Sequence, residues 1–249
     1  MADKAITGEV VKTYAVWDRN IRWFHWINVI CVLLLAILGT LILNTEILGV
    51  SGGGKILLKE LHTYTGYVFF LNLLWRFTWA FVGGRYARWR AILPGGRGYG
   101  KALADYIKGL RRGEPPAYLG HNPLGRLMVG MLLLLLLVQG LTGLVLAGTD
   151  LYKPPFGSFI ATWVTGGEAE NLAGLRPGSK AFVDPLAYEE MRRYRKPVVT
   201  VHLYCFYTLM VLIVLHITGV VTAEVRERSN LVSALFSGRK TLTKPPLDG

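Results

Sequence analysis

Residues 198–223 read VVTVHLYCFYTLMVLIVLHITGVVTA, and this stretch decides the fold of the chain. It exceeds the roughly 20 mostly apolar residues that a helix needs to cross a bilayer, and it lacks Asp, Glu, Lys and Arg. It does contain His202 and His216. Their spacing is almost four helical turns and about 21 Å of rise, so both imidazoles face one side at two depths. Because ionisable residues inside a span suggest function, we interpret them as one ligand for each of two stacked cofactors.

Three further apolar blocks reach spanning length, and none of the four blocks contains an acidic residue. The 249-residue chain is 52% hydrophobic, with a mean hydropathy of +0.36, which is unusual for a soluble domain. We therefore predict an all-α membrane protein, a four-transmembrane-helix bundle that forms a single domain over residues 1–249. The predicted spans cover residues 24–43, 62–83, 124–148 and 198–223.

The formal net charge of +12 is compatible with nucleic-acid binding, but its distribution indicates membrane topology instead. The N-terminal arm, the loop 84–123 and the C-terminal tail hold 17 Lys and Arg residues, while the loops 44–61 and 149–197 hold 9. The positive-inside rule then places both termini in the cytoplasm. We expect a multi-pass protein of the bacterial cytoplasmic (inner) membrane, with membrane lipid and no nucleic acid as partners.

The N-terminal arm and the cysteines carry no sign of secretion. No short apolar core with a small-residue cleavage site precedes the first span, so we expect no cleaved signal peptide. Cys31 and Cys205 lie in predicted helices near opposite membrane faces, and we interpret them as small packing residues. The absence of a C-x-x-C-H motif argues against a covalently attached haem.

The first two spans carry complementary polar residues and glycines. His25 lies at the cytoplasmic end of the first span, and Gly39 follows fourteen residues later. His62 opens the second span at the outer side, followed by Gly66 and, fourteen residues after the histidine, by Arg76. We predict cofactor contacts for both glycines, although helix packing explains Gly39 equally well. Arg76 should pair with a cofactor propionate or a neighbouring polar group, and the alternative is that it extends to the interface.

The four histidines within the predicted spans form two pairs by depth. Helices 1 and 2 run antiparallel, as do helices 1 and 4, so His25 and His216 lie toward the cytoplasm while His62 and His202 lie toward the outer side. The pairs are about 20 Å apart. One metal ion cannot use all four, because metal–nitrogen bonds are near 2 Å. Two b-type haems, each bound between two imidazoles, fit this arrangement, and the alternative is histidines that only hydrogen-bond helices together.

Five motifs together resemble the b-type cytochrome subunit of membrane-bound NiFe hydrogenases. That subunit belongs to the bacterial cytochrome b561 superfamily, which also includes the gamma subunit of formate dehydrogenase. The resemblance covers the four spans and the cytoplasmic loop. The motifs are Arg22-Trp23-Phe24-His25-Trp26, His62-x3-Gly66-Tyr67, Arg76-Phe77-x-Trp79-Ala80-Phe81-Val82-Gly83, Gly120-His121-Asn122-Pro123 and His202-x13-His216.

The resemblance implies an electron-transfer subunit of a quinone oxidoreductase complex, with haem b ligated by His25 with His216 and by His62 with His202. Our leading interpretation is a di-haem cytochrome that transfers electrons across the membrane between a periplasmic redox partner and the quinone pool. That partner is a hydrogenase or a c-type cytochrome. The alternatives are a membrane anchor of a NiFe hydrogenase, a passive anchor with vestigial histidines, and a non-redox transporter that uses the histidines. A homodimer is left open.

The cytoplasmic loop 84–123 contains a predicted amphipathic helix. Leu103, Tyr106, Ile107 and Leu110 repeat at helical spacing, which is typical of a helix on the inner leaflet. We expect His121 to be no ligand. Free N–H groups at the start of the third span suggest that Asn122 and Gly125 bind a quinone, and the alternative is that Asn122 only caps the helix.

The outer loop 149–197 is far longer than a simple connection requires. We predict that it docks the periplasmic partner, and the alternative is a lid that shields the outer haem. Asp184 and Pro185 should start a short helix interrupted at Pro197. We also expect Gln139 to bond another helix and the tail after Ser237 to be loose.

Overall fold

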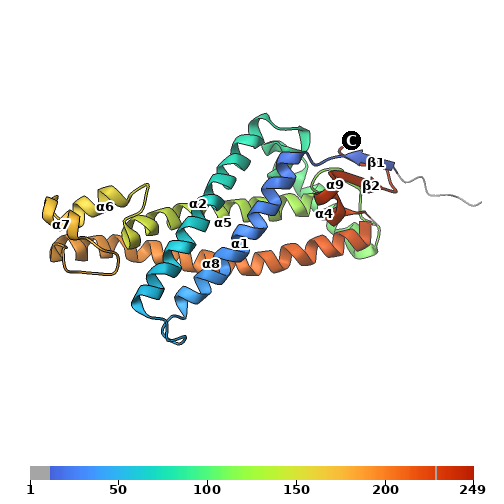
Figure 1. Ribbon diagram of the computed structural model, residues 1–249. Coiled ribbons are helices and arrows are strands. Elements are labelled where there is room, and N and C mark those ends of the chain that lie inside the picture. The colour runs from blue at the N-terminus through green and yellow to red at the C-terminus, as the bar shows by residue number, and fades with distance from the viewer. Residues whose placement is uncertain (1–11, 228) are drawn as a thin grey trace, which may run out of the picture. The chain divides into compact units, whose positions relative to one another are not determined.

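The computed structural model describes residues 12–227 and 229–249, and the chain is mostly helical (Figure 1). The long helices are α1 (Arg19–Leu43), α2 (Gly52–Val82), α5 (Pro123–Leu151) and α8 (Pro185–Glu227). The short helices are η1 (Arg85–Ala87), α3 (Trp89–Ile92), α4 (Tyr99–Arg112), α6 (Gly157–Val164), α7 (Ala169–Gly174) and α9 (Leu231–Ser237). Two short strands, β1 (Lys12–Ala15) and β2 (Arg239–Leu242), complete the elements.

Three of the long helices, α1, α5 and α8, are long and apolar enough to cross a membrane. Helix α2 has 31 residues against 25 in α1, but it includes Lys55, Lys59 and Glu60 in its first turns. The predicted predominance of helix is therefore confirmed, and three of the four predicted spans lie in helices that could cross a membrane. The predicted fourth span, the orientation of the termini and the side on which the long loop lies stay predictions.

The helices begin earlier than hydropathy predicted, because hydropathy marks only the apolar part of a helix. Helix α2 begins at Gly52, inside the predicted loop 44–61. Helix α8 begins at Pro185, and the Asp184 side chain accepts a hydrogen bond from the N–H of Ala187 at 2.7 Å, as an N-cap does. The predicted interruption at Pro197 is wrong, since α8 continues through it. Proline removes one helical hydrogen bond, and the surrounding helix accommodates that loss.

The chain divides into two compact units. The first contains the described residues up to His25 together with Arg76–Leu133 and Val211–Gly249, and the second contains Trp26–Trp75 and Leu134–Met210. The boundaries fall inside all four long helices, so each unit contains a segment of each. The histidines divide accordingly, with His25 and His216 in the first unit and His62 and His202 in the second.

The C-terminal tail is tied to the first unit, so the predicted loose tail after Ser237 is wrong. Strand β2 pairs antiparallel with β1, with Lys12 opposite Leu242. Leu242 is 2% exposed and packs in a small apolar cluster with Ala117 and Leu119. The Asp248 carboxylate accepts the backbone N–H groups of Leu119 and Gly120, at 2.6 and 2.9 Å. Backbone pairing and burial of one leucine hold a segment whose composition alone suggests a loose end.

Helix α4 has the amphipathic character that its sequence predicts. Tyr106 is 1% exposed, while Lys101, Asp105 and Lys108 are exposed. The helix ends at Gly113, which has the positive φ of a glycine C-cap (79°).

The long loop of the second unit is folded against the start of α8. Ile160 and Val164 of α6 are buried with Met191 of α8. Asp150, at the end of α5, accepts a charged hydrogen bond from Lys59 at 2.5 Å and is also bonded by Arg195. Arg192 pairs with Glu189 at 3.2 Å, so two residues of the basic segment 192–196 are already paired within the chain.

Candidate functional site

Two of the predicted ligands face each other in the second unit. His62 comes from α2 and His202 from α8, and their ring centroids are 6.3 Å apart with the ring planes inclined at 69°. Both side chains are half-buried. Helix α2 places His62 three turns inside its first residue, whereas His202 follows Pro197 by little more than one turn. The two rings therefore lie near each other in the structure, and their role as a ligand pair stays a prediction.

Two residues of α5 fix the ring of His202. The Thr142 hydroxyl lies 2.8 Å from His202 Nδ1, and it also lies 2.7 Å from the carbonyl oxygen of Val138. The single hydroxyl proton goes to that carbonyl, so Nδ1–H of His202 donates to Thr142 and Nε2 keeps a lone pair. The Gln139 amide nitrogen lies 3.1 Å from Nε2. In this tautomer the Nε2 lone pair accepts from the Gln139 amide, so a metal at Nε2 would have to replace that hydrogen bond.

Glycines lie beside both imidazoles of the second unit. A Cβ atom on Gly39 would come within 3.5 Å of His62 Cε1, and one on Gly143 would come within 3.5 Å of His202 Cε1. Both distances are ordinary van der Waals contacts, so each imidazole packs beside a glycine of a neighbouring helix at a place where an alanine would also fit. A Cβ on Gly66 would meet nothing within 4 Å, so the space beside that residue is open.

The other predicted pair lies in the first unit. His25 comes from α1 and His216 from α8, and both side chains are half-buried. The structure thus assigns each predicted pair to one unit.

Arg76 is buried in the first unit. It is 4% exposed, its guanidinium donates to the carbonyl oxygen of Ala87 at 3.1 Å, and it lies 5.8 Å from the centre of the Phe24 ring. The expected polar partner therefore exists, and the alternative in which Arg76 extends to the interface does not describe this structure. Its predicted contact with a haem propionate stays a prediction.

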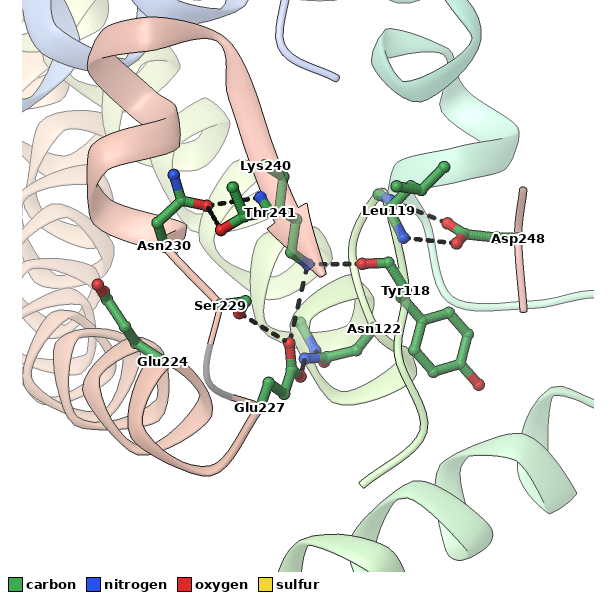
Figure 2. A network of polar contacts seen from close by, with 12 residues as sticks. Tyr118, Leu119, Asn122, Glu224, Glu227, Ser229, Asn230, Lys240, Thr241 and Asp248 are labelled. Atoms are coloured by element: carbon green, nitrogen blue, oxygen red, sulfur yellow. Dashed lines mark hydrogen bonds and ion pairs between the residues drawn. The ribbon is translucent and has the colours of Figure 1, made fainter. Parts of the chain in front are cut away.

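Asn122 and Gly125, which we predicted to bind quinone, are bonded to each other. The N–H of Gly125 donates to Asn122 Oδ1 at 2.7 Å, which is the helix cap that we held as the alternative. The Asn122 amide also donates to Tyr106 at 2.7 Å and to Glu227 at 3.2 Å (Figure 2). A quinone carbonyl would have to compete with these bonds, and quinone binding by this pair stays a prediction.

The second unit fits a haem with two axial histidines. Iron bound to two opposed imidazole nitrogens at about 2 Å each keeps the ring centroids about 6 Å apart. The 6.3 Å between His62 and His202 matches this spacing. The open space at Gly66 and the tautomer of His202 agree with it. Within residues 12–227 and 229–249, no group of three or more His, Cys, Asp or Glu side chains could hold a bare metal ion.

From the sequence we did not predict that Thr142 and Gly143 contact His202. We predicted a bond from Gln139 to another helix without naming its partner. The signal was present, since these residues lie within one turn of each other in a leucine-rich helix. Polar and small residues on one face of such a helix indicate a neighbour that needs them. The expected bond from Gln139 to another helix is confirmed, and the partner is His202.

Comparisons with known proteins agree over most of the chain. The model of a family described as prokaryotic cytochrome b561 matches residues 16–238. The chain is 22% identical over 242 residues to the probable Ni/Fe-hydrogenase B-type cytochrome subunit of Cupriavidus necator, with 94% of this chain and 90% of that protein covered. It is 25% identical over 237 residues to the protein of the same description from Rhodobacter capsulatus, with 91% and 80% covered. The probable Ni/Fe-hydrogenase 1 B-type cytochrome subunit of Escherichia coli strain K12 is 32% identical over 126 residues, with 47% and 52% covered.

Proposed function

Because the chain belongs to the prokaryotic cytochrome b561 family, we propose that it is the b-type cytochrome subunit of a membrane-bound NiFe hydrogenase. It transfers electrons between that enzyme and the membrane quinone pool. The observation that carries this function is the spacing of His62 and His202 in the second unit. The descriptions of the relatives support the hydrogenase alternative over the broader interpretation with a c-type cytochrome as partner.

Four histidines hold two haems b in this proposal. His62 and His202 bind one in the second unit, and His25 and His216 bind the other in the first unit. Each haem would carry one electron at a time. The protein supplies the axial nitrogens, the orientation of each ring and burial from water. Thr142 fixes His202 through its Nδ1–H, and Arg76 adds a buried positive charge in the first unit.

The membrane arrangement rests on charge and hydropathy. We propose that α2 is a fourth span, that both termini lie in the cytoplasm and that residues 149–197 face the periplasm. The distribution of Lys and Arg supports this orientation. The folded core of α6 and the start of α8 gives that loop a defined surface on which the hydrogenase docks. Shortening the loop within residues 166–180 should slow electron entry from the hydrogenase while both haems stay in place. An unchanged rate of electron entry would refute docking.

A redox role fits the spans better than transport does. Proton and metal pathways through membranes usually contain carboxylates, and the four predicted spans contain none. The polar residues that contact His202 are an amide and a hydroxyl, which orient an imidazole and carry no charge. The histidines therefore serve as ligands in our proposal, and quinone binds at the cytoplasmic end near Asn122 and Gly125.

Purification of the tagged chain from bacterial membranes, under conditions that keep complexes intact, tests this function. We expect a hydrogenase to co-purify, a reduced low-spin b-type haem spectrum, and hydrogen-dependent reduction of added quinone. The control is the same chain from cells without hydrogenase, which should keep the spectrum and lose the reduction. A chain without the spectrum would contradict the redox role. A chain with the spectrum but no hydrogenase would contradict only the partner.

Removing the hydroxyl of Thr142 should weaken haem binding in the second unit. In Thr142→Val the Nδ1–H of His202 loses its acceptor, and loss of such an outer partner typically costs about 10- to 100-fold in affinity. Haem titration of the apoprotein, followed by absorption, measures the effect. Thr142→Ser keeps the hydroxyl and should bind like the wild type. Equal haem affinity in the valine and serine variants would show that the bond does not matter.

A further inference from the structure

The first unit contains a cavity that is lined by sequence neighbours of Asn122 and Gly125 but by neither of those two residues. Its volume is about 610 Å³, which lies in the range of small-molecule sites. The segment between α2 and α5 forms most of its wall, and Asp248 closes it from the C-terminal tail. Gly95 and Gly98 lie in this wall with φ values of 144° and 81°, so the loop conformation itself requires glycine there.

The wall of the cavity is strongly basic. Asp248 is the one carboxylate in the wall, and it is already bonded to two backbone N–H groups. None of the wall's arginines forms an ion pair with any residue that the structure describes. The arginines of the wall are Arg85, Arg88, Arg90, Arg97 and Arg126.

Some of these guanidinium groups form hydrogen bonds within the wall, and others form none and can bind a ligand. Arg126 donates to the carbonyl oxygens of Leu93 and Arg90, at 2.9 and 3.0 Å, and so holds the loop together. Arg88 donates to the Gly83 carbonyl oxygen at 3.0 Å. The side chains of Arg90 and Arg97 make no hydrogen bond or ion pair with the described part of the chain. Two guanidinium groups at one cavity match the several oxygens of a phosphate group.

His121 is a further polar residue of the wall, and one of its ring nitrogens is buried. This nitrogen, Nδ1, has no hydrogen-bond partner among residues 12–227 and 229–249. Burial and then the charges of Arg76 and Lys240 lower the pKa of His121 to about 3, so the ring is neutral near pH 7. A neutral imidazole can donate one N–H to an anionic oxygen.

The position of the cavity indicates which kind of molecule would carry the phosphate group. Pro123, the first residue of the spanning helix α5, lines it, and so do Tyr99 and Ala102 of the amphipathic helix α4. Basic pockets at the ends of membrane helices bind the head groups of acidic lipids. We propose that this cavity binds a phosphate group, supplied by the head group of an anionic phospholipid. The rings of Tyr86 and Tyr99 offer apolar surface to the rest of the lipid.

Lipid-dependent thermal unfolding of the full haem-loaded chain in detergent tests this site. The probes are phosphatidylglycerol, phosphatidylcholine as the uncharged control, and sodium phosphate as the free anion. Phosphatidylglycerol should raise the midpoint of the wild type in a saturable way, and phosphatidylcholine should not. In Arg90→Gln/Arg97→Gln the apparent affinity should fall roughly 25-fold, since each membrane-proximal arginine contributes about fivefold.

The matched control is Arg111→Gln/Arg112→Gln. These two exposed arginines belong to α4 in the same loop, and they do not line the cavity. The control should bind phosphatidylglycerol like the wild type. Unchanged haem spectra show that each variant is folded. Equal affinity in the two double variants would overturn the proposal, and so would an equal response to sodium phosphate, which would make the ligand a free anion.

Discussion

Replacing His202 with Ala should lower the haem content of the purified chain from two per chain to one. His62 and His202 hold one haem in the second unit of the proposed arrangement, and their rings already lie at the separation that two axial ligands need. His25 and His216 belong to the other unit, so their haem should remain. A haem assay against protein concentration and the reduced absorption spectrum measure this result.

Tyr204→Ala is the matched control for this loss. Tyr204 lies two residues further along α8 and is 67% exposed, so its removal should leave both haems in place. His62→Ala should lose the same haem as His202→Ala, and the double variant should lose no more than either single variant. A His202→Ala protein that still holds two haems would contradict the pairing. A wild type with one haem would contradict the count.

The structure also explains why the sequence predicts the pairing of the histidines better than the contacts that orient them. Histidine spacing in α8 and antiparallel helices are enough to pair His62 with His202, because periodicity and span order are local properties. The hydrogen bond between Thr142 and Nδ1 of His202 depends on how α5 is rotated about its axis. A leucine-rich run has little periodicity, so the sequence does not predict that rotation. Hydropathy likewise places the apolar part of α2 but not its start at Gly52, since the first turns are polar.

The C-terminal tail after Ser237 is also held by contacts that the local sequence does not predict. Residues after Ser237 contain two prolines and no long apolar run, so composition indicates a loose end. What holds them is pairing with a strand more than two hundred residues away and one buried charge pair. Both are long-range contacts, and no local pattern encodes them. The cavity wall is a further example, because it brings Asp248 beside a loop that begins near Arg85.

The buried charge pair leads to the largest stability effect that we expect. Lys240 Nζ lies 3.8 Å from Glu227 Oε2, and both side chains are 2% exposed. Lys240 also donates to the carbonyl oxygen of Tyr118 at 2.5 Å (Figure 2), while Glu227 accepts from Tyr106 at 2.7 Å. Burial lowers the pKa of Lys240, and the charge of Glu227 opposes that change. The pair therefore joins strand β2 to the end of α8 without access to water.

Lys240→Met should destabilise the folded tail by about 3–5 kcal/mol, because it leaves the charge of Glu227 buried without its partner. Adding Glu227→Gln should restore most of this loss, since methionine and glutamine leave no buried charge. Lys244→Met is the control, because Lys244 is exposed and should tolerate the change. Hydrogen exchange of β2 and thermal unfolding measure both effects. If the double variant were no more stable than Lys240→Met, packing of the lysine stem would hold the tail, and the ion pair would not.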